Sequence, residues 1–168
     1  GSKDYSADAI AQLGSVLVHG IAVRPGHPVI LGILSPQPDS KSGAHIPVIG
    51  VPGYPVSTAL TGEIIVRPLL AHWQGIATNP PLTIQASLAR KVLSPTGDDE
   101  FLRVAVGKVG ERVIATPLSR GAAMITSLVR ADGIVRIPRF TEGFPSGAEV
   151  SVDLYRHPQQ IERSIFAI

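Results

Sequence analysis

The sequence predicts an α/β domain followed by a mainly β domain. In the first half, apolar runs of strand length alternate with helical patterns, which is typical of α/β folds. In the second half, apolar and polar residues alternate over short segments, which indicates strands with one buried face. Residues 75–81, which end in Pro80-Pro81, mark the boundary between the two. We therefore expect one domain over residues 1–76, a second over 77–156, and a linker over 157–168 that leads into a further domain.

Three strands are expected in the first half, because three apolar runs are bounded by glycine or proline. The low charge of these runs indicates buried strands, and we expect the strands to run parallel. The polar segment Pro36–Gly43 fits a surface turn. The three runs are Val16–Val23, Pro28–Leu34 and Ile46–Val51.

Two helices are expected around these strands. Ser6–Leu13 has apolar residues at helical spacing, and Gly14 is suited to end the helix. Pro55–Trp73 carries a longer apolar stripe, and Pro55 suits a first helical turn. Because Pro68 lacks a backbone N–H, we expect it to kink or divide this helix.

In the second half we expect strands, one turn and one helix. Gly107–Gly110 fits a hairpin turn. Ala122–Arg130 fits a short helix that plugs the small β domain, with Gly133 to stop it. Alternation predicts strands at Ile84–Leu88, Leu102–Val106 and Val150–Leu154.

Two Pro-Gly-X-Pro tetrapeptides, Pro25-Gly26-His27-Pro28 and Pro52-Gly53-Tyr54-Pro55, are the most informative local pattern. Proline fixes φ, while glycine lets a ligand approach the backbone closely. Two such loops after parallel strands would build one edge of the sheet, where open α/β folds bind ligands. Either loop alone is more often only a tight turn, so the prediction of a binding edge depends on the pair.

Composition narrows the classes of function. Hydrophobic residues make up 44% of the chain and charged residues 17%, which favours buried strands over a highly charged surface. A net charge of +2 without a basic cluster gives little support to nucleic-acid binding. The absence of cysteine excludes disulfides, thiolate zinc sites, iron–sulfur clusters and cysteine nucleophiles, and it is compatible with a cytoplasmic protein. The uncharged segment Ser42–Gly62 contains three prolines and so is not one continuous membrane helix.

Taken together, the motifs resemble those of the molybdopterin molybdenumtransferase family, the MoeA and gephyrin group. The resemblance implies an incomplete three-layer (MogA-like) α/β domain that binds molybdopterin, followed by a small C-terminal β-barrel-like domain. Ile161–Ile168 resembles the linker of relatives that continue into a periplasmic-binding-protein-like domain. The motifs are Asp4-Tyr5, Leu13-Gly14, Val23–Pro28, Val51–Ser57, Val66–Leu70, Ser119–Leu128, Ala131–Gly133 and Gly147–Val150.

This resemblance implies an activity. Family members insert molybdate into adenylylated molybdopterin and release AMP, normally with the assistance of Mg²⁺. We therefore expect a pterin nucleotide and molybdate as substrates, a homodimer in the full protein, and neither nucleic acid nor membrane as a partner. Because the early part of the α/β domain would precede this chain, we expect the chain alone to be inactive.

The resemblance also assigns residues. Arg24 matches a basic position before Pro-Gly and is expected to clamp the anion, since a guanidinium offers forked donors to oxyanions; the alternative is a surface charge at a strand end. Asp4 matches an acidic position that positions magnesium or substrate, and the alternative is a solvated residue near a chain end. Ser57 is expected either to donate to the anion or to stabilise the first helical turn. The expected binding residues are Pro25, Gly26, His27, Pro28, Pro52, Gly53, Tyr54, Pro55 and Ser57.

Three positions depart from the family pattern. Gly20 and His27 stand where lysine is common, and Tyr54 stands where asparagine is common. The departures at Gly20 and Tyr54 and the apparent downstream fusion favour a second hypothesis, a non-catalytic relative that senses molybdopterin or molybdate. Arg24 and both Pro-Gly loops favour the transferase. A third hypothesis, a docking scaffold, ranks last because nothing in Leu82–Tyr155 indicates a partner groove.

Overall fold

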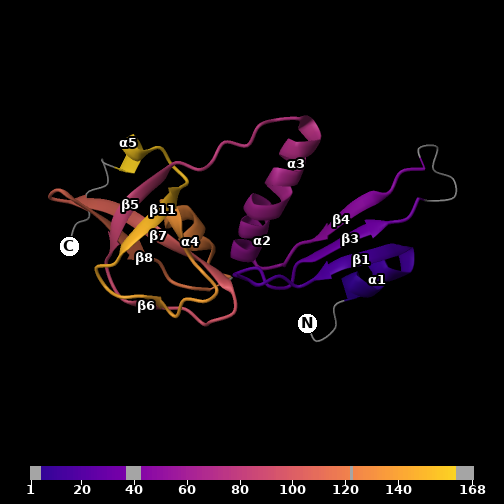
Figure 1. Ribbon diagram of the computed structural model, residues 1–168, viewed down its shortest axis with the longest axis horizontal. Coiled ribbons are helices and arrows are strands. Elements are labelled where there is room, and N and C mark those ends of the chain that lie inside the picture. The colour runs from indigo at the N-terminus through magenta and orange to yellow at the C-terminus, as the bar shows by residue number, and fades with distance from the viewer. Residues whose placement is uncertain (1–4, 37–42, 122, 162–168) are drawn as a thin grey trace.

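The computed structural model describes residues 5–36, 43–121 and 123–161. A three-stranded sheet with its helix lies at one end, a β-barrel at the other, and a long helical segment between them (Figure 1). Asp4 and most of the predicted turn at Pro36–Gly43 lie outside the described residues. The observed architecture confirms the predicted order of an α/β region followed by a small β-barrel.

The first sheet is formed by β1 (Gly14–His19), β3 (Ile30–Leu34) and β4 (Ile46–Gly50), in the order β1-β3-β4. Both pairings are antiparallel, so the expectation that neighbouring strands run parallel is wrong. The reason is the length of the connections, since a parallel crossover needs a dozen or more residues and usually a helix. Because β3 lies antiparallel between them, β1 and β4 still run in the same direction and end at the same edge, opposite Ile30.

Helix α1 (Tyr5–Leu13) covers one face of this sheet, as its apolar spacing predicts. Ile10 is its buried residue and lies over Gly32 of β3. A Cβ atom at Gly32 would lie 2.5 Å from Cγ2 of Ile10, so only glycine allows the helix to approach this closely.

The predicted strand Val16–Val23 is divided in two. Gly20 has a φ of +90°, and after it the chain leaves the first sheet. The short strand β2 (Val23–Arg24) then pairs in parallel with β7 of the barrel. This pairing connects the two parts of the molecule through their backbones.

The long helical segment is interrupted, as Pro68 predicts. It consists of α2 (Pro55–Thr61), a π-helical segment η1 (Gly62–Val66) and α3 (Arg67–Gln74). The ring of Pro68 removes the N–H that would donate to the carbonyl four residues earlier, and the adjacent π-helical turn accommodates the change. Gly75 ends α3 with a φ of +64°.

The second part is a closed five-stranded barrel in the order β7-β8-β5-β11-β9, with β9 returning to β7. Its strands are β5 (Thr83–Leu88), β7 (Asp99–Val109), β8 (Arg112–Pro117), β9 (Gly133–Ile137) and β11 (Glu149–Leu154). A two-stranded ribbon joins β6 (Val92–Leu93) to β10 (Gly143–Phe144). The buried core consists of Ala86, Leu88, Val92, Leu102, Val104, Val106, Ala115, Val135, Ile137, Val150, Val152 and Leu154.

The expected hairpin is formed by β7 and β8, but its turn lies at Gly110-Glu111, and Gly107 lies within β7. Two other expectations in this half are wrong. Helix α4 (Ile125–Arg130) does not plug the barrel, because no residue of it belongs to the barrel core. Gly133 begins β9 rather than stopping the helix: a Cβ there would lie 2.6 Å from the carbonyl oxygen of Asp153.

The chain continues past the barrel into a short helix, α5 (Pro158–Ile161). Residues 162–168, the remainder of the predicted linker, lie outside the described part. No helix within the described residues has the length and apolar character to cross a membrane.

Candidate functional site

The two Pro-Gly-X-Pro patterns lie in loops that leave the same edge of the first sheet, and we call residues 20–29 the first loop and residues 51–55 the second loop. The first loop is closed by backbone hydrogen bonds, with Gly20 N–H donating to Val29 O at 2.7 Å. The peptide bond between Arg24 and Pro25 is cis, and Gly26 has a φ of +135°. Glycine adopts this φ readily, whereas other residues do so at a steric cost.

The barrel holds the first loop in place. Val23 and Arg24 pair with Asp99 and Glu100 of β7, and the N–H of Asp99 donates to Ala22 O at 2.9 Å. The loop also lies against α2, because a Cβ at Gly26 would be 3.6 Å from the hydroxyl oxygen of the buried Thr61. The first loop is therefore fixed between the barrel and the long helical segment.

Arg24 is already engaged within the chain. Its Nε donates to Oδ2 of Asp98 at 2.5 Å, and Nδ1 of His27 lies 3.8 Å from the other oxygen of the same carboxylate. The side chain of Asp98 is only 12% exposed, whereas that of Arg24 is 52% exposed. Two side chains expected to bind an anion thus face a carboxylate of the protein itself.

Asp98 begins a run of three acidic residues, and each member pairs with different arginines. Asp99 accepts from Arg136 at 3.0 Å and from Arg139 at 3.3 Å, while Oε1 of Glu100 lies 3.2 Å from Nε of Arg120. Three neighbouring carboxylates are therefore kept apart in separate ion pairs.

The pKa of the Asp99 carboxyl is set by two opposing effects. Burial raises this pKa, but hydrogen bonds from the backbone N–H of Arg139 and from the side chains of Arg136 and Arg139 lower it more, so that it lies below its ordinary value. The ionised form of Asp99 is thus favoured in the folded protein.

Arg24 and Pro25 line a cavity of about 220 Å³ between the first loop and the barrel. Three arginines surround it, and the full lining is Arg24, Pro25, Glu100, Phe101, Leu102, Arg103, Leu118, Arg120 and Gly121. Arg120 is held by Glu100 and by a hydrogen bond from its Nη1 to Leu93 O at 2.6 Å. The second oxygen of Glu100, Oε2, is buried and accepts no hydrogen bond from the described residues.

Arg103 differs from the other two arginines because it is buried and, among the described residues, has no carboxylate partner. Its Nε donates to Oγ of Ser127 at 2.8 Å, and its Nη2 to Ser119 O at 3.5 Å. Burial lowers the pKa of Arg103, and the nearby Tyr155 opposes that shift. A guanidinium stays charged despite such a shift, so this cavity has a fixed positive charge in its wall.

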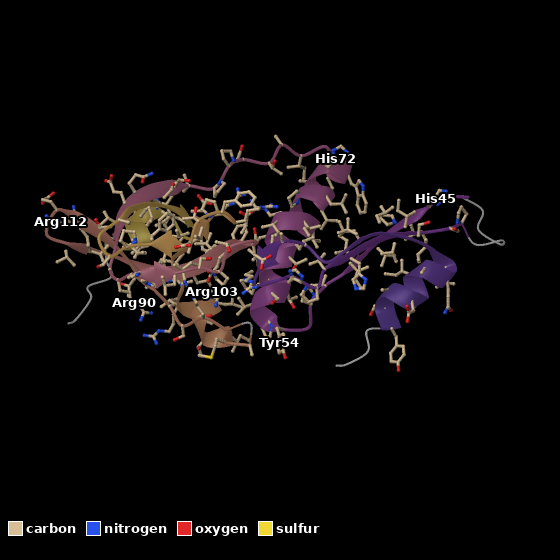
Figure 2. All side chains as sticks on the ribbon, turned by 60° about the horizontal axis from the view of Figure 1, so that its bottom comes forward. His45, Tyr54, His72, Arg90, Arg103 and Arg112 are labelled. Atoms are coloured by element: carbon tan, nitrogen blue, oxygen red, sulfur yellow. The ribbon has the colours of Figure 1, made fainter. Side chains whose placement is uncertain are left out.

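The second loop is held by its own helix. The hydroxyl of Thr58 donates to Pro52 O at 2.5 Å and lies 3.0 Å from Tyr54 O, and Pro55 occupies the first turn of α2. Tyr54 is 62% exposed at the start of α2 (Figure 2). Ser57 is only 3% exposed, which places it with the packing of the first turn rather than on an open surface.

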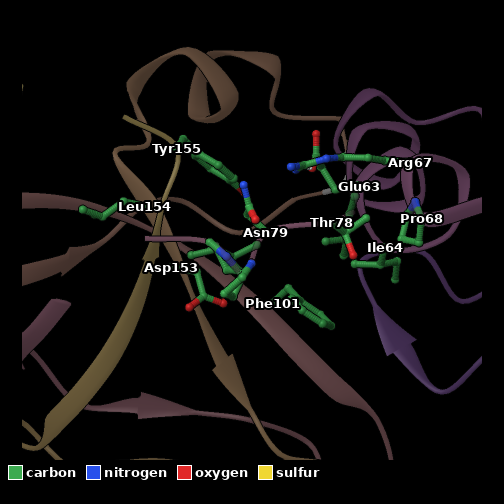
Figure 3. Close-up of a pocket in the computed structure, with 14 residues that line it drawn as sticks. Glu63, Ile64, Arg67, Pro68, Thr78, Asn79, Phe101, Asp153, Leu154 and Tyr155 are labelled. Carbon is green, nitrogen blue, oxygen red and sulfur yellow. Dashed lines mark hydrogen bonds and ion pairs between the residues drawn. The ribbon is translucent and has the colours of Figure 1, made fainter. Parts of the chain in front are cut away.

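A larger cavity of about 480 Å³ lies between the long helical segment and the barrel. Glu63 and Arg67 extend toward it from the helical side, and Asp153 and Tyr155 from the barrel side (Figure 3). Glu63 and Arg67 already form an ion pair at 2.8 Å. Burial raises the pKa of Tyr155. None of the residues that the sequence predicts for the functional site lines this larger cavity.

The structure thus brings only part of the predicted site together. Arg24 and Pro25 share a cavity with barrel residues, while Val56 at the start of α2 lines a different one. His45 lies just before β4, and His72 lies on α3 (Figure 2). Sequence reasoning missed Asp98, Glu100, Arg103 and Arg120. The run of three acids before the predicted strand marked Asp98 and Glu100, and Arg120 lies in the motif Ser119–Leu128, but neither pattern assigned these residues a role.

The comparisons with known proteins cover both halves. Residues 1–72 match the family described as "Probable molybdopterin binding domain", and residues 85–155 match the "MoeA C-terminal region (domain IV)". Over 154 residues the chain is 30% identical to a Methanocaldococcus jannaschii protein provisionally assigned to molybdopterin biosynthesis, covering 92% of this chain and 33% of that protein. It is 29% identical to the molybdopterin molybdenumtransferase of Synechococcus elongatus, covering 90% of this chain and 35% of the enzyme.

A solved structure agrees with these matches. The crystal structure of a MoeA molybdopterin biosynthesis protein from Pyrococcus horikoshii superposes with a TM-score of 0.67 at 36% identity, covering 90% of this chain and 35% of that one. The chain spans about a third of the length of the curated relatives it matches. The chain therefore belongs to the MoeA family and corresponds to the C-terminal part of its members.

Proposed function

We propose that this chain is the C-terminal part of a protein that inserts molybdate into adenylylated molybdopterin and releases AMP. The names of the relatives support a role in molybdenum cofactor biosynthesis. The observation that carries the proposal is the arginine-lined cavity beside the first loop, where Arg24 of β2 meets Arg103 and Arg120 of the barrel region.

The residues of this cavity suit a tetrahedral oxyanion or a phosphate. Arg24 offers forked donors at a partly exposed position, and buried Arg103 supplies a positive charge in the wall of the cavity. Pro25 and Pro28 restrict the backbone of the first loop, so the backbone position of Arg24 is set before any ligand arrives. Pro52, Gly53, Tyr54 and Pro55 are proposed to shape the neighbouring part of the edge, where the pterin nucleotide would lie.

Magnesium belongs to the expectation from the family, but the described residues do not fit a magnesium site. No group of three histidine, aspartate or glutamate side chains among them could hold a metal ion. The acidic residues nearest the cavity, Asp98 and Glu100, are each bound by an arginine. Asp4 lies outside the described residues, so we assign no step to a metal and include Mg²⁺ only as a component of the assay.

We further propose that the whole protein is a homodimer and that the 168-residue chain alone does not turn over substrate. β1 and β4 are both edge strands of a three-stranded sheet, and Leu17 on β1 is 61% exposed. Unpaired strand edges and exposed apolar side chains are normally covered by further chain or by a partner. Light scattering of a polypeptide extended upstream of Gly1 tests the dimer, and a monomeric mass at micromolar concentration would contradict it.

The activity is tested by AMP release. Adenylylated molybdopterin is incubated with Mg²⁺, with and without molybdate, and with either the 168-residue chain, the extended polypeptide, or the Synechococcus elongatus relative as a positive control. We expect molybdate-dependent AMP release from the extended polypeptide and the relative, and none from the chain alone. If the extended polypeptide folds but releases no AMP while the relative does, the transferase proposal fails.

One observation favours the second candidate, a non-catalytic relative that senses molybdopterin or molybdate. Arg24, the expected anion clamp, is already neutralised by Asp98 at 2.5 Å. A sensor would bind adenylylated molybdopterin without releasing AMP. Calorimetric binding of the pterin nucleotide by the extended polypeptide, in the absence of turnover, is the result that would select this function.

A further inference from the structure

Asp98 occupies an unusual place in the candidate site, because its carboxylate faces both side chains of the first loop that were expected to receive an anion. One oxygen accepts from Nε of Arg24 at 2.5 Å, and the other lies 3.8 Å from Nδ1 of His27. Asp98 stands immediately before β7, and β2 pairs in parallel with β7, with Arg24 opposite Glu100. The pairing therefore keeps Arg24 and Asp98 near each other, and their side chains make the contact.

The contact between Asp98 and Arg24 changes the balance of charge around the cavity. Of the three arginines that line the cavity, Arg24 is paired with Asp98 and Arg120 with Glu100, which leaves Arg103 without a carboxylate partner in the described part of the chain. A divalent oxyanion entering the cavity would meet two carboxylates nearby. Because like charges at such distances repel, each carboxylate weakens the binding of a free anion.

Asp98 and Glu100 differ in how they hold their arginines. Arg120 also donates to Leu93 O, and Oε1 of Glu100 lies 3.2 Å from it, so this pair belongs to the wall of the cavity. Among the residues that the structure describes, Arg24 has no side-chain hydrogen-bond or ion-pair partner other than Asp98, and its side chain is half exposed. Arg24 is thus the arginine that a ligand can recruit, and Asp98 is the group with which the ligand must compete.

We propose that Asp98 acts as an internal counter-ion of Arg24 and holds the oxyanion site in a self-occupied state. The inference rests on the proposed function in that it takes the ligand to be a tetrahedral oxyanion or phosphate. A free oxyanion binds only in competition with the carboxylate. A ligand that makes further contacts beyond its oxyanion group, such as a pterin nucleotide, has more binding free energy with which to displace the Asp98 carboxylate from Arg24. Asp98 therefore lowers the affinity of the site for free anions, molybdate included.

The test measures anion binding without any pterin substrate, so its result is independent of transferase activity. Molybdate, sulfate and phosphate are titrated calorimetrically into the 168-residue chain at low ionic strength, where screening is weak. We expect Asp98→Asn to raise the affinity for molybdate about tenfold or more over the wild-type chain, because one repelling charge is removed and Arg24 is released.

Two control variants make the same change of charge elsewhere. Glu149→Gln alters an exposed residue at the start of β11, and Glu111→Gln alters an exposed residue in the hairpin turn. Neither control should change molybdate affinity more than about twofold, and Asp98→Asn combined with Arg24→Gln should lose the gain.

The outcomes decide the matter in either direction. Higher affinity in Asp98→Asn alone supports the inference, while equal or lower affinity overturns it and makes Asp98 a residue that positions Arg24. If Asp98→Asn does not fold, the ¹⁵N NMR signal of Arg24 Nε in the wild-type chain provides the measurement. It should stay unmoved at molybdate concentrations that fully shift the signals of exposed arginines, and a shift at low millimolar molybdate would contradict the inference.

Discussion

The first and second loops carry the same Pro-Gly-X-Pro pattern and leave the same edge of the sheet, yet they are held in different ways. The first loop is fixed from outside, by strand pairing with β7 and by the Arg24–Asp98 ion pair. The second loop is fixed from within, by the hydroxyl of Thr58 one helical turn later. The tetrapeptide therefore sets a rigid backbone in both places, and the contacts of each loop decide its chemistry.

Arginine substitutions should separate the two loops most strongly. Arg24→Ala removes the guanidinium that is proposed to bind the oxyanion, and we expect molybdate-dependent AMP release by the extended polypeptide to fall about 100-fold. Arg67→Ala, on α3 of the long helical segment, removes an exposed pair with Glu63 and should change the rate less than about twofold. Equal losses in the two variants would show that the cavity beside the first loop is not the anion site.

Glycine substitutions compare the two backbones directly. Gly26 has a φ of +135°, and Gly26→Ala should lower the free energy of unfolding by about 2 kcal/mol, because other residues are strained there. Gly53 does not have a positive φ, and a Cβ built there meets nothing within 4 Å. Gly53→Ala should therefore stay within about 0.5 kcal/mol of the wild type, or stabilise the chain slightly. Urea unfolding of the three proteins measures both effects, and a larger loss in Gly53→Ala would reverse the comparison.

The sequence was sufficient to predict what depends on local pattern. Pro68 marked the interruption of the long helix, and alternation marked β5, β7 and β11. The sequence was insufficient to predict strand direction and pairing, because these depend on which distant segments pack together. The short connections placed β3 antiparallel between β1 and β4, and Gly20 turned β2 out of the first sheet toward the barrel.

The candidate site shows the same division. Arg24 and its loop could be named from the sequence, because proline and glycine at fixed spacing have a local physical meaning. Its partner Asp98 lies 74 positions later and reaches Arg24 only through the pairing of β2 with β7. No local pattern contains that pairing, so neither Asp98 nor the positions of Arg103 and Arg120 could be assigned before the fold was known.

Thr58 is the residue that should loosen the second loop without affecting the first. Thr58→Val keeps the shape of the side chain but removes the hydroxyl that donates to Pro52 O. We expect the free energy of unfolding to fall by about 1 kcal/mol, because one partly exposed hydrogen bond is lost and water can replace part of it. Amide exchange should speed up at residues 53–58 and stay unchanged at Asp99. Faster exchange at Asp99 would show that the two loops open together.

Acid should loosen the anchorage of the first loop while leaving the second intact. The pKa of Asp99 is lowered from 3.8: burial raises it, but hydrogen bonds from Arg139 and Arg136 outweigh that effect. A carboxyl with a lowered pKa stabilises the fold fully above its unfolded pKa, and this contribution is lost as pH falls through the folded value. The first loop is therefore fully anchored near pH 7, and its anchorage loosens as the pH falls below about 4.

Amide exchange between pH 5 and pH 3, corrected for the intrinsic rate at each pH, compares the two anchors in one experiment. Protection of the Asp99 N–H, which donates to Ala22 O beside Arg24, should fall as Asp99 is protonated. Protection of the Thr58 N–H, which donates to Tyr54 O, should persist because residues 51–58 contain no carboxylate. In Asp99→Asn the difference in pH dependence should disappear. If both amides lose protection together in the wild type, the barrel does not anchor the first loop separately, and the contrast between the two loops does not hold.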